Sequence, residues 1–436
     1  MARPENSQYS NHIGESKNAY LAFASWQVEN LSYCDMVWNS KDSLDLLGCR
    51  EVENSYELVG CLGSFNLKYS INSEKCSDSW FLRDCKNCSS CVGCTNLRNK
   101  EFHVFNQPYS KDEYQKKILE LKFDTLQGIE KVGEQFERLN LKSINRYANL
   151  VNCENSTGDT LQNVHNCKWM FSMGESTDSA YCINGGLNMK QFYDGYGVGS
   201  NFERGYMCFD TGLDARDNIG CGIVWGCPYA YYSFNCHTSF EIFGCTGVRG
   251  KKYCILNKQY SKEEYDKLKT RLIAHMKETG EWGEFFPPSV SPFNYNETLA
   301  QEYTPLSRAM ALDRGFKWQD KMPGVFGKET LDATKVPDTI AEVKDQMLNE
   351  VLACSKCQKN YKITVFELAF YRKHQLPLPL SCPDCRYHVR LALRLPHLLW
   401  PRQCGCQGTA SGDYKNTVAH FHGTIKCPNK FESPFA

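Results

Sequence analysis

The chain has 436 residues, which corresponds to two or three domains with room for a sizeable hydrophobic core. Lys plus Arg and Asp plus Glu each number 50, so the net charge of zero provides no general argument for a polyanionic partner. Hydrophobic residues make up 42%, which excludes a disordered chain, and no apolar run reaches the roughly 18–20 residues of a membrane span. The N-terminal residues lack the apolar core of a signal peptide, so we expect a cytoplasmic protein with no membrane contact.

The 24 cysteines are the unusual feature of the composition. Disulfide scaffolds are short secreted chains, whereas this chain is long and shows no leader. We therefore expect reduced thiols, some acting as metal ligands and others as small buried side chains.

The first part of the chain spaces its cysteines quasi-regularly, and Cys76, Cys85 and Cys94 are nine residues apart. The intervening segments are rich in Asn, Ser, Gly and Asp and have no sustained helical period. This pattern predicts a mainly β fold in which short strands stack coil upon coil as a β-solenoid, with a small side chain directed inward. A β-sandwich with a cysteine-rich core is the alternative.

An internal duplication organises the chain. The segment 97–114, LRNKEFHVFNQPYSKDEY, recurs as 248–265, VRGKKYCILNKQYSKEEY, at an offset of 151 residues. Each copy carries an S-x-x-E capping box, at Ser110 and at Ser261, that predicts a helix covering the end of a solenoid. We predict a first solenoid half with its helical cap over 1–145 and a second over 146–285.

The cysteines at 85, 88, 91 and 94 form a C-x2-C-x2-C-x2-C run, a pattern that invites an iron–sulfur interpretation. The duplication places Ser239 at the position of Cys88 and Ile242 at that of Cys91. A position that accepts isoleucine is typical of packing, so we predict buried thiols here.

The composition of the sequence changes after residue 285, where proline and aromatic residues become frequent. We predict an irregular connector over 286–350, ending in an amphipathic helix around 340–352, and a C-terminal α+β zinc-ribbon domain over 351–436. The ribbon rests on two C-x-x-C pairs, with a helix expected between them around 366–374. Four thiolates in two tight turns are the closed shell of a structural zinc site, whereas paired thiols that merely pack are the alternative. The predicted ligands are Cys354, Cys357, Cys382 and Cys385.

The tail contains further ligand types that suggest a second zinc site. The candidates are Cys404, Cys406, Cys427 and His422. A C-x-C pair is more closely spaced than the C-x2–4-C pairs typical of zinc sites, so an incomplete tail with no metal is the alternative.

A basic segment follows the second C-x-x-C pair. Its candidate nucleic-acid contacts are Arg386, Arg390, Arg394, Trp400 and Arg402. A spacing of four places the first three on one helix face, where guanidinium groups suit phosphate contacts. A solvated helix face or an acidic partner within the chain explains the same residues equally well.

Several segments together resemble one protein family. They are SKNAYLAF at 16–23, the two copies of the duplicated segment, SPFNYNETLAQEYTPL, GFKW, and FYRKHQLPLPLSCPDCRYHVRLALRLPHLLWPRQC. The family is a group of cysteine-rich, zinc-ribbon-ended proteins common in candidate-phyla bacteria, and 354–386 is similar to a small bacterial zinc-ribbon domain. The resemblance implies zinc at the two C-x-x-C pairs and implies no reaction. Relatives tend to have more solenoid cysteines and a final C-x-x-C knuckle.

The sequence contains no G-x-x-x-x-G-K-[ST], G-x-S-x-G or H-E-x-x-H motif. We therefore predict a non-enzymatic binding or scaffold protein with a structural zinc ribbon and a protein partner or assembly, which includes homo-oligomers. The alternatives are a nucleic-acid-associated zinc-ribbon factor, a structural subunit of a larger assembly, and an enzyme that uses an unpaired cysteine.

Overall fold

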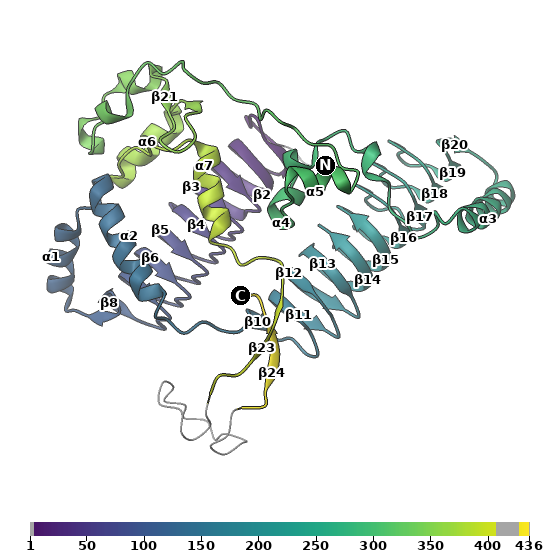
Figure 1. The fold of residues 1–436 in the computed structure, drawn as a ribbon, viewed down its shortest axis with the longest axis horizontal. Helices are drawn as coiled ribbons and strands as arrows, with labels where there is room; N and C mark the ends of the chain where they lie inside the picture. Colours follow the sequence, from purple (N-terminus) through teal and green to yellow (C-terminus); the bar gives the residue numbers. More distant parts are fainter. Residues whose placement is uncertain (1–3, 407–426, 436) are drawn as a thin grey trace. The chain divides into compact units, whose positions relative to one another are not determined.

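The computed structural model describes residues 4–406 and 427–435. Two compact units divide the chain: the first comprises residues 1–145 and 321–394, and the second comprises 146–320 and 395–436. Each unit is built on one large, almost entirely parallel sheet (Figure 1). The predicted mainly β character is therefore confirmed. The boundary at residue 394 divides the segment 351–436 between the units.

The sheet of the first unit, called here the first stack, has nine strands in chain order. Every pair is parallel except the closing hairpin of β8 and β9. Hydrogen bonds join residues 12 apart, so each strand lies one 12-residue repeat beyond the last. The strands are β1 (Asn11–Gly14), β2 (Lys17–Asp35), β3 (Trp38–Leu47), β4 (Tyr56–Val59), β5 (Phe65–Ile71), β6 (Ser77–Arg83), β7 (Ser89–Thr95), β8 (Glu101–Val104) and β9 (Gln107–Pro108).

A three-residue period runs along the first stack. Every third residue is left-handed, as at Asn18 (φ 52°), Leu21 (φ 48°) and Ala24 (φ 45°). The residue that follows each of them is buried, as at Ala19 and Ala22. Each 12-residue repeat thus contains four triplets, and each triplet turns the backbone and directs one side chain inward. Asparagine tolerates the left-handed conformation better than most residues, which explains its abundance between the inward positions.

Polar side chains connect successive repeats. On the outside, Asn18 Nδ2 donates to Asn30 Oδ1 at 2.8 Å, and Asn30 Nδ2 donates to Asp42 Oδ1 at 2.8 Å. On the inside, Ser25 Oγ donates to the carbonyl of Phe23 at 2.7 Å and accepts from the backbone N–H of Val37 at 3.2 Å. The same double bonding recurs at other inward serines, so buried N–H groups find partners without regular sheet pairing.

The sheet of the second unit, the second stack, has eleven strands and also closes with an antiparallel hairpin, β19–β20. Some repeats here have 13 residues, as in the ladder from Asn188 to Asn201. The extra residue lies at a glycine-bearing turn, where a Cβ on Gly199 would lie 2.0 Å from the carbonyl oxygen of Gly186. The strands are β10 (Leu150–Val151), β11 (Gly158–His165), β12 (Met170–Thr177), β13 (Ala180–Gly185), β14 (Met189–Tyr196), β15 (Phe202–Phe209), β16 (Arg216–Ile219), β17 (Ala230–Tyr231), β18 (Phe240–Phe243), β19 (Lys252–Ile255) and β20 (Lys258–Gln259).

The helices predicted after each duplicated segment are confirmed. Complete capping boxes begin α1 (Lys111–Leu121) and α3 (Lys262–Glu278). The first cap continues as α2 (Leu126–Asn140), whose Phe136 ring packs against that of Phe81 of the first stack. Among the described residues, no helix combines the length and apolar character needed to cross a bilayer.

The helix predicted around 340–352 is wrong. Two short 3-10 turns, Ile340–Glu342 and Asp345–Asn349, occupy this segment, and Val343 between them is extended. Ile340, Val343 and Met347 are all buried in the core of the first unit, so packing rather than helical periodicity sets the backbone here. In the second unit, the preceding connector contains the short helices α4 (Ala300–Tyr303) and α5 (Arg308–Asp313) and two 3-10 turns, Pro288–Val290 and Tyr295–Glu297.

Candidate metal centres and the docked four-cysteine module

Residues 351–394 form a small α+β module, called here the four-cysteine module, within the first unit. Strand β21 (Leu352–Ala353) pairs antiparallel with β22 (Asn360–Tyr361), and the turn between them carries Cys354 and Cys357. Helix α6 (Val365–His374) follows as predicted. The third cysteine, Cys382, is the N-cap of α7 (Pro383–Ala392), which places Cys385 in the first turn of that helix.

The sulfur atoms of all four cysteines lie within 4.8 Å of one another. Cys357 Sγ and Cys382 Sγ are 3.7 Å apart. This distance matches the edge of about 3.8 Å that metal–sulfur bonds of about 2.3 Å give in a tetrahedron. The module therefore brings the four predicted ligands together in an arrangement that can hold a metal ion.

The backbone around Cys354 favours its thiolate. Burial alone would raise the pKa of this thiol, but N–H groups of Cys382, Cys357 and Lys356 point at the sulfur and lower the pKa to about 6. The N–H of Cys382 donates to Cys354 Sγ at 3.2 Å, and that of Lys356 at 3.4 Å. Burial raises the pKa of Cys382 to about 11, so the four thiols differ in acidity.

A second group of thiols lies in the second unit. Strands β23 (Trp400–Gln403) and β24 (Lys430–Ser433) form an antiparallel pair, and beyond its end the N–H of Cys404 donates to the carbonyl of Asn429 at 2.9 Å. This pairing brings the sulfurs of Cys404, Cys406 and Cys427 within 4.8 Å of one another. The fourth predicted ligand, His422, lies outside the described residues.

Two arginines of the predicted basic face are buried. Arg386 is 5% exposed and Arg390 is 1% exposed, although both lie on α7. Arg386 Nε is 3.0 Å from Asp45 Oδ2 of β3, and its Nη2 is 3.4 Å from Glu367 Oε1 of α6. Arg390 Nη1 is 2.8 Å from Asp45 Oδ1 and 2.8 Å from Glu57 Oε2. These two guanidinium groups hold the module on the first stack and do not form an exposed basic face.

Aromatic and aliphatic contacts surround this ion cluster. The Arg386 guanidinium lies 5.0 Å from the ring centre of Tyr33, whose hydroxyl donates to Glu367 Oε2 at 2.9 Å. The ring of Tyr56 on β4 packs against Phe370 and Tyr371 of α6. On the neighbouring side of the stack, Leu47, Val59 and Ile71 meet Tyr387 and Leu391 of α7. Both helices of the module are therefore packed on the stack.

The remaining candidates for nucleic-acid contact do not join the buried pair. Arg394 follows α7 in the first unit, whereas Trp400 and Arg402 lie on β23 in the second unit. Arg402 is exposed, and its Nε donates to the carbonyl of Phe435 at 3.1 Å. The five residues therefore form no single site within either unit.

The C-x2-C-x2-C-x2-C run lies at inward positions of the first stack. Cys85, Cys88, Cys91 and Cys94 are all buried, with exposed fractions of 0–1%. Each sulfur donates to the carbonyl two residues before it, just as the inward serines do. They are not among the described groups of three or more ligands within 4.8 Å, so their arrangement fits the predicted packing role.

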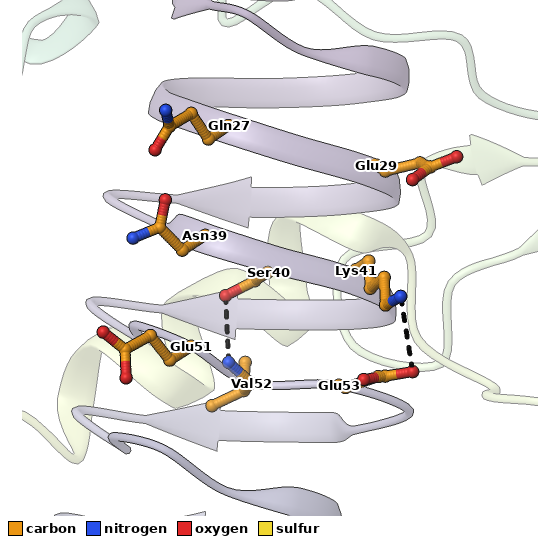
Figure 2. Close-up of a pocket in the computed structure, with 8 residues that line it drawn as sticks. All are labelled: Gln27, Glu29, Asn39, Ser40, Lys41, Glu51, Val52 and Glu53. Atoms are coloured by element: carbon orange, nitrogen blue, oxygen red, sulfur yellow. Dashed lines mark hydrogen bonds and ion pairs between the residues drawn. The ribbon is translucent and has the colours of Figure 1, made fainter.

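A shallow groove of about 350 Å³ lies on the outside of the first stack (Figure 2). Gln27, Asn39 and Glu51 form one rim, whereas Glu29, Lys41 and Glu53 form the other. Lys41 Nζ is 3.8 Å from Glu53 Oε1, and this pair bridges adjacent repeats along the second rim. The groove follows from the 12-residue repeat, and its rims carry no cysteine or histidine.

Comparisons with known proteins do not assign the chain to a family. No family model matches it, and no curated protein matches it. One solved structure from Desulfovibrio desulfuricans G20, a protein provisionally assigned as an acetyltransferase, aligns at 13% identity with a TM-score of 0.13. The alignment covers 52% of this chain and 63% of that protein. So low a score carries no structural or functional argument.

Proposed function

We propose that the protein is a non-enzymatic binding scaffold whose four-cysteine module is a structural zinc ribbon. The observation that carries this proposal is the docking of that module: the first stack binds a two-helix element through a buried ion cluster and an aromatic face. A surface that binds helices within its own chain is suited to bind helices of other proteins in the same way.

The regular repeats support a scaffold with two β-solenoids. Inward positions recur every third residue and strands succeed one another in parallel at 12-residue steps, which is the expected geometry of stacked coils. Such stacks are rigid and present long, regular faces. The closing hairpins β8–β9 and β19–β20 pair the last parallel strand of each stack, and α2 and α3 pack on the side faces of the final repeats.

Zinc is the metal that best suits the four-cysteine module. Four thiolates, a sulfur–sulfur distance of 3.7 Å and backbone N–H groups aimed at sulfur favour a soft tetrahedral cation. Four protein ligands leave no position for water, so this zinc would stabilise the fold. The three tail thiols would hold a second zinc only with a fourth ligand, for which His422 remains the candidate.

Metal analysis and chelation test the ribbon. Protein purified without a metal-binding tag should contain one zinc per chain, or two if the tail site is filled. Removing zinc should raise hydrogen exchange in α6 and α7 and leave the amides of β5 and β6 protected. Stoichiometric iron, or no change in exchange on chelation, would contradict the proposal.

Partner binding tests the scaffold. A stoichiometric protein partner should stay bound through nuclease treatment and moderate salt. Retention that disappears with nuclease, or falls steeply with ionic strength, would favour the nucleic-acid alternative. Elution at high mass regardless of nuclease would favour a subunit of an assembly. Localisation in the cytoplasm, together with the family resemblance, remains a prediction from the sequence.

A further inference from the structure

The first stack holds Arg386 in a receptor made by two adjacent repeats. Tyr33 supplies an aromatic face 5.0 Å from the guanidinium, and Asp45 supplies a carboxylate oxygen 3.0 Å from Nε. The two residues are neighbours across the stack, because Ser32 pairs with Leu44 in the parallel register of β2 and β3. Beside them, Leu44 and Tyr56 are paired on adjacent strands, and we call such a series of paired positions a column. The Tyr56 ring of this column contacts α6.

The duplication locates the same column in the second stack. The repeated segment aligns Val104 of β8 with Ile255 of β19. From these residues, the paired positions lead back strand by strand, through Val92, Trp80, Lys68 and Tyr56 to Leu44 in the first stack. In the second stack they lead through Phe243, Tyr231, Ile219 and Tyr206 to Tyr193. Tyr206 is therefore the counterpart of Tyr56, and Tyr193 that of Leu44.

One further step identifies a second guanidinium receptor. Ala180 pairs with Tyr193 in the register of β13 and β14, so Tyr181 and Asp194 are neighbours in successive repeats. They are the counterparts of Tyr33 and Asp45. In the first stack this pair is buried, with Tyr33 at 7% and Asp45 at 0% exposed, whereas Tyr181 is 54% exposed and Asp194 is exposed.

The second stack covers only one end of this column. Tyr231, Phe243 and Ile255 pack under α3 and Trp282. Tyr193, at the other end, is 46% exposed. No ion pair of Asp194 occurs among residues 4–406 and 427–435. We call Tyr181, Tyr193, Asp194 and Tyr206 the uncovered face.

We propose that the uncovered face docks an α-helix of a partner protein, with one arginine of that helix held between Tyr181 and Asp194. This inference rests on the proposed scaffold function and names its site and the chemistry of its partner. The uncovered face is complementary to such a helix in charge and shape, because the same pair of residue types at the same register already binds an arginine of a helix in the first stack.

The differences between the two receptors define the partner further. Met207 stands where the first stack has Glu57, the residue that pairs with Arg390. The partner helix therefore needs one arginine rather than two, with an apolar side chain one turn later against the methionine. Tyr193 and Tyr206 offer two rings to apolar side chains, as Tyr56 does to Phe370 and Tyr371.

A peptide of the chain's own docking helix provides the probe. We would titrate the full zinc-loaded chain into a fluorescent peptide of residues 381–395 with Cys382→Ser, Cys385→Ser and Arg390→Leu, and follow anisotropy. The last change keeps Arg386 and places an apolar side chain one turn later. We expect saturable binding that weakens about tenfold in Asp194→Asn and in Tyr181→Ser, because each change removes one half of the receptor. Glu175→Gln, a carboxylate on another face of the second stack, is the matched control and should bind like the unmodified chain.

The peptide itself carries the second control, since Arg386→Ala in it should abolish the difference between the unmodified chain and Asp194→Asn. No saturable binding, or equal affinity for Asp194→Asn, would overturn the proposal. Sedimentation velocity tests whether a second copy of the chain binds the uncovered face. Dimerisation that Asp194→Asn abolishes would assign the face to a second copy and would also overturn the proposal. A nuclease-resistant partner that binds equally to Asp194→Asn and Tyr181→Ser would leave the scaffold function standing and remove only this site.

Discussion

Replacing Arg390 by methionine should release the four-cysteine module from the first stack without altering the metal site. The side chain is 1% exposed, and its Nη1 lies 2.8 Å from carboxylate oxygens of both Asp45 and Glu57. Asp45 is itself fully buried, so its carboxylate would lose one of two arginine partners while staying away from water. Removing one member of a buried ion pair costs about 3–5 kcal/mol, and we expect Arg390→Met to fall in this range.

Hydrogen exchange of the α7 amides measures this loss directly. Exchange in the zinc-loaded chain gives the free energy of local opening of α7, and the amides of β6 serve as an internal reference for the stack. The companion variant is Glu57→Gln, which keeps the shape of the side chain and removes its charge. The loss of stability in the double variant should be smaller than the sum of the losses in the two single variants. We expect a difference of about 1–3 kcal/mol, because the two groups interact.

Arg394→Met is the matched control, since this arginine follows the same helix but is only half-buried, whereas Arg390 is 1% exposed. A loss below about 1 kcal/mol for Arg390→Met, or a loss equal to that of Arg394→Met, would refute the argument that buried pairing holds the module.

Three further predictions concern the stack and the module. Ser55→Ala should cost about 1–3 kcal/mol in urea unfolding, because the buried N–H of Leu67 loses its acceptor, whereas Ser55→Cys should recover most of the loss. Burial, helped by nearby lysines, lowers the pKa of His374 from 6.5 to about 4. The unfolded chain therefore binds an extra proton between these values, and stability should fall as the pH drops through this window. Allowing for partial exposure, we expect a loss of about 1–2 kcal/mol by pH 4.5 that is absent in His374→Gln; equal pH profiles would contradict this. Gly199→Ala should prevent cooperative thermal unfolding of the second unit, because its Cβ would lie 2.0 Å from the carbonyl oxygen of Gly186; an unchanged transition would contradict it.

The local features of the fold could be predicted because each rests on a short-range signal. The capping boxes at Ser110 and Ser261 begin helices wherever the preceding strand ends, and both helices form. The two C-x-x-C pairs likewise specify tight turns that present two sulfurs each, and the structure gathers all four. The duplication required no structural knowledge, since it is visible as a repeated segment at a fixed offset.

The carboxylate partners of the basic helix could not be predicted from the sequence. Asp45 and Glu57 lie more than 300 positions before Arg386 and Arg390 and look like ordinary surface residues of a strand-rich segment. Only the tertiary fold brings them together. The sequence does contain one signal. Asp45 and Glu57 occupy successive positions of a column with a 12-residue spacing, and the residues on either side of them in that column, Tyr33 and Tyr69, are aromatic. Such acidic positions within an aromatic column indicate a cationic partner.

The three-residue period is also present in the sequence, but the cysteines alone do not show it. Counting only thiols gives irregular steps, such as those from Cys34 to Cys49 to Cys61. Counting serine, alanine, valine and leucine with cysteine gives one inward residue in every triplet from Ser16 to Leu97. All of these side chains are apolar or carry a single polar atom near the backbone, so each can be buried in the interior without an unpaired polar group.

Cysteine and serine are interchangeable at the inward positions, and this accounts for the high cysteine content of the stacks without assigning those thiols a chemical reaction. An inward serine donates to the carbonyl two residues earlier and accepts an N–H from the next repeat, as Ser79 does with Ser77 and Cys91. An inward cysteine makes the same pair of bonds, since Cys227 donates to the carbonyl of Trp225 and accepts from the N–H of Ser239. Sulfur is larger and less strongly solvated than oxygen, so cysteine fills more of the interior and loses less hydration on burial. The thiols of the stacks therefore take the same packing positions as the inward serines, whereas the two cysteine groups outside the stacks are the described groups that could hold a metal ion.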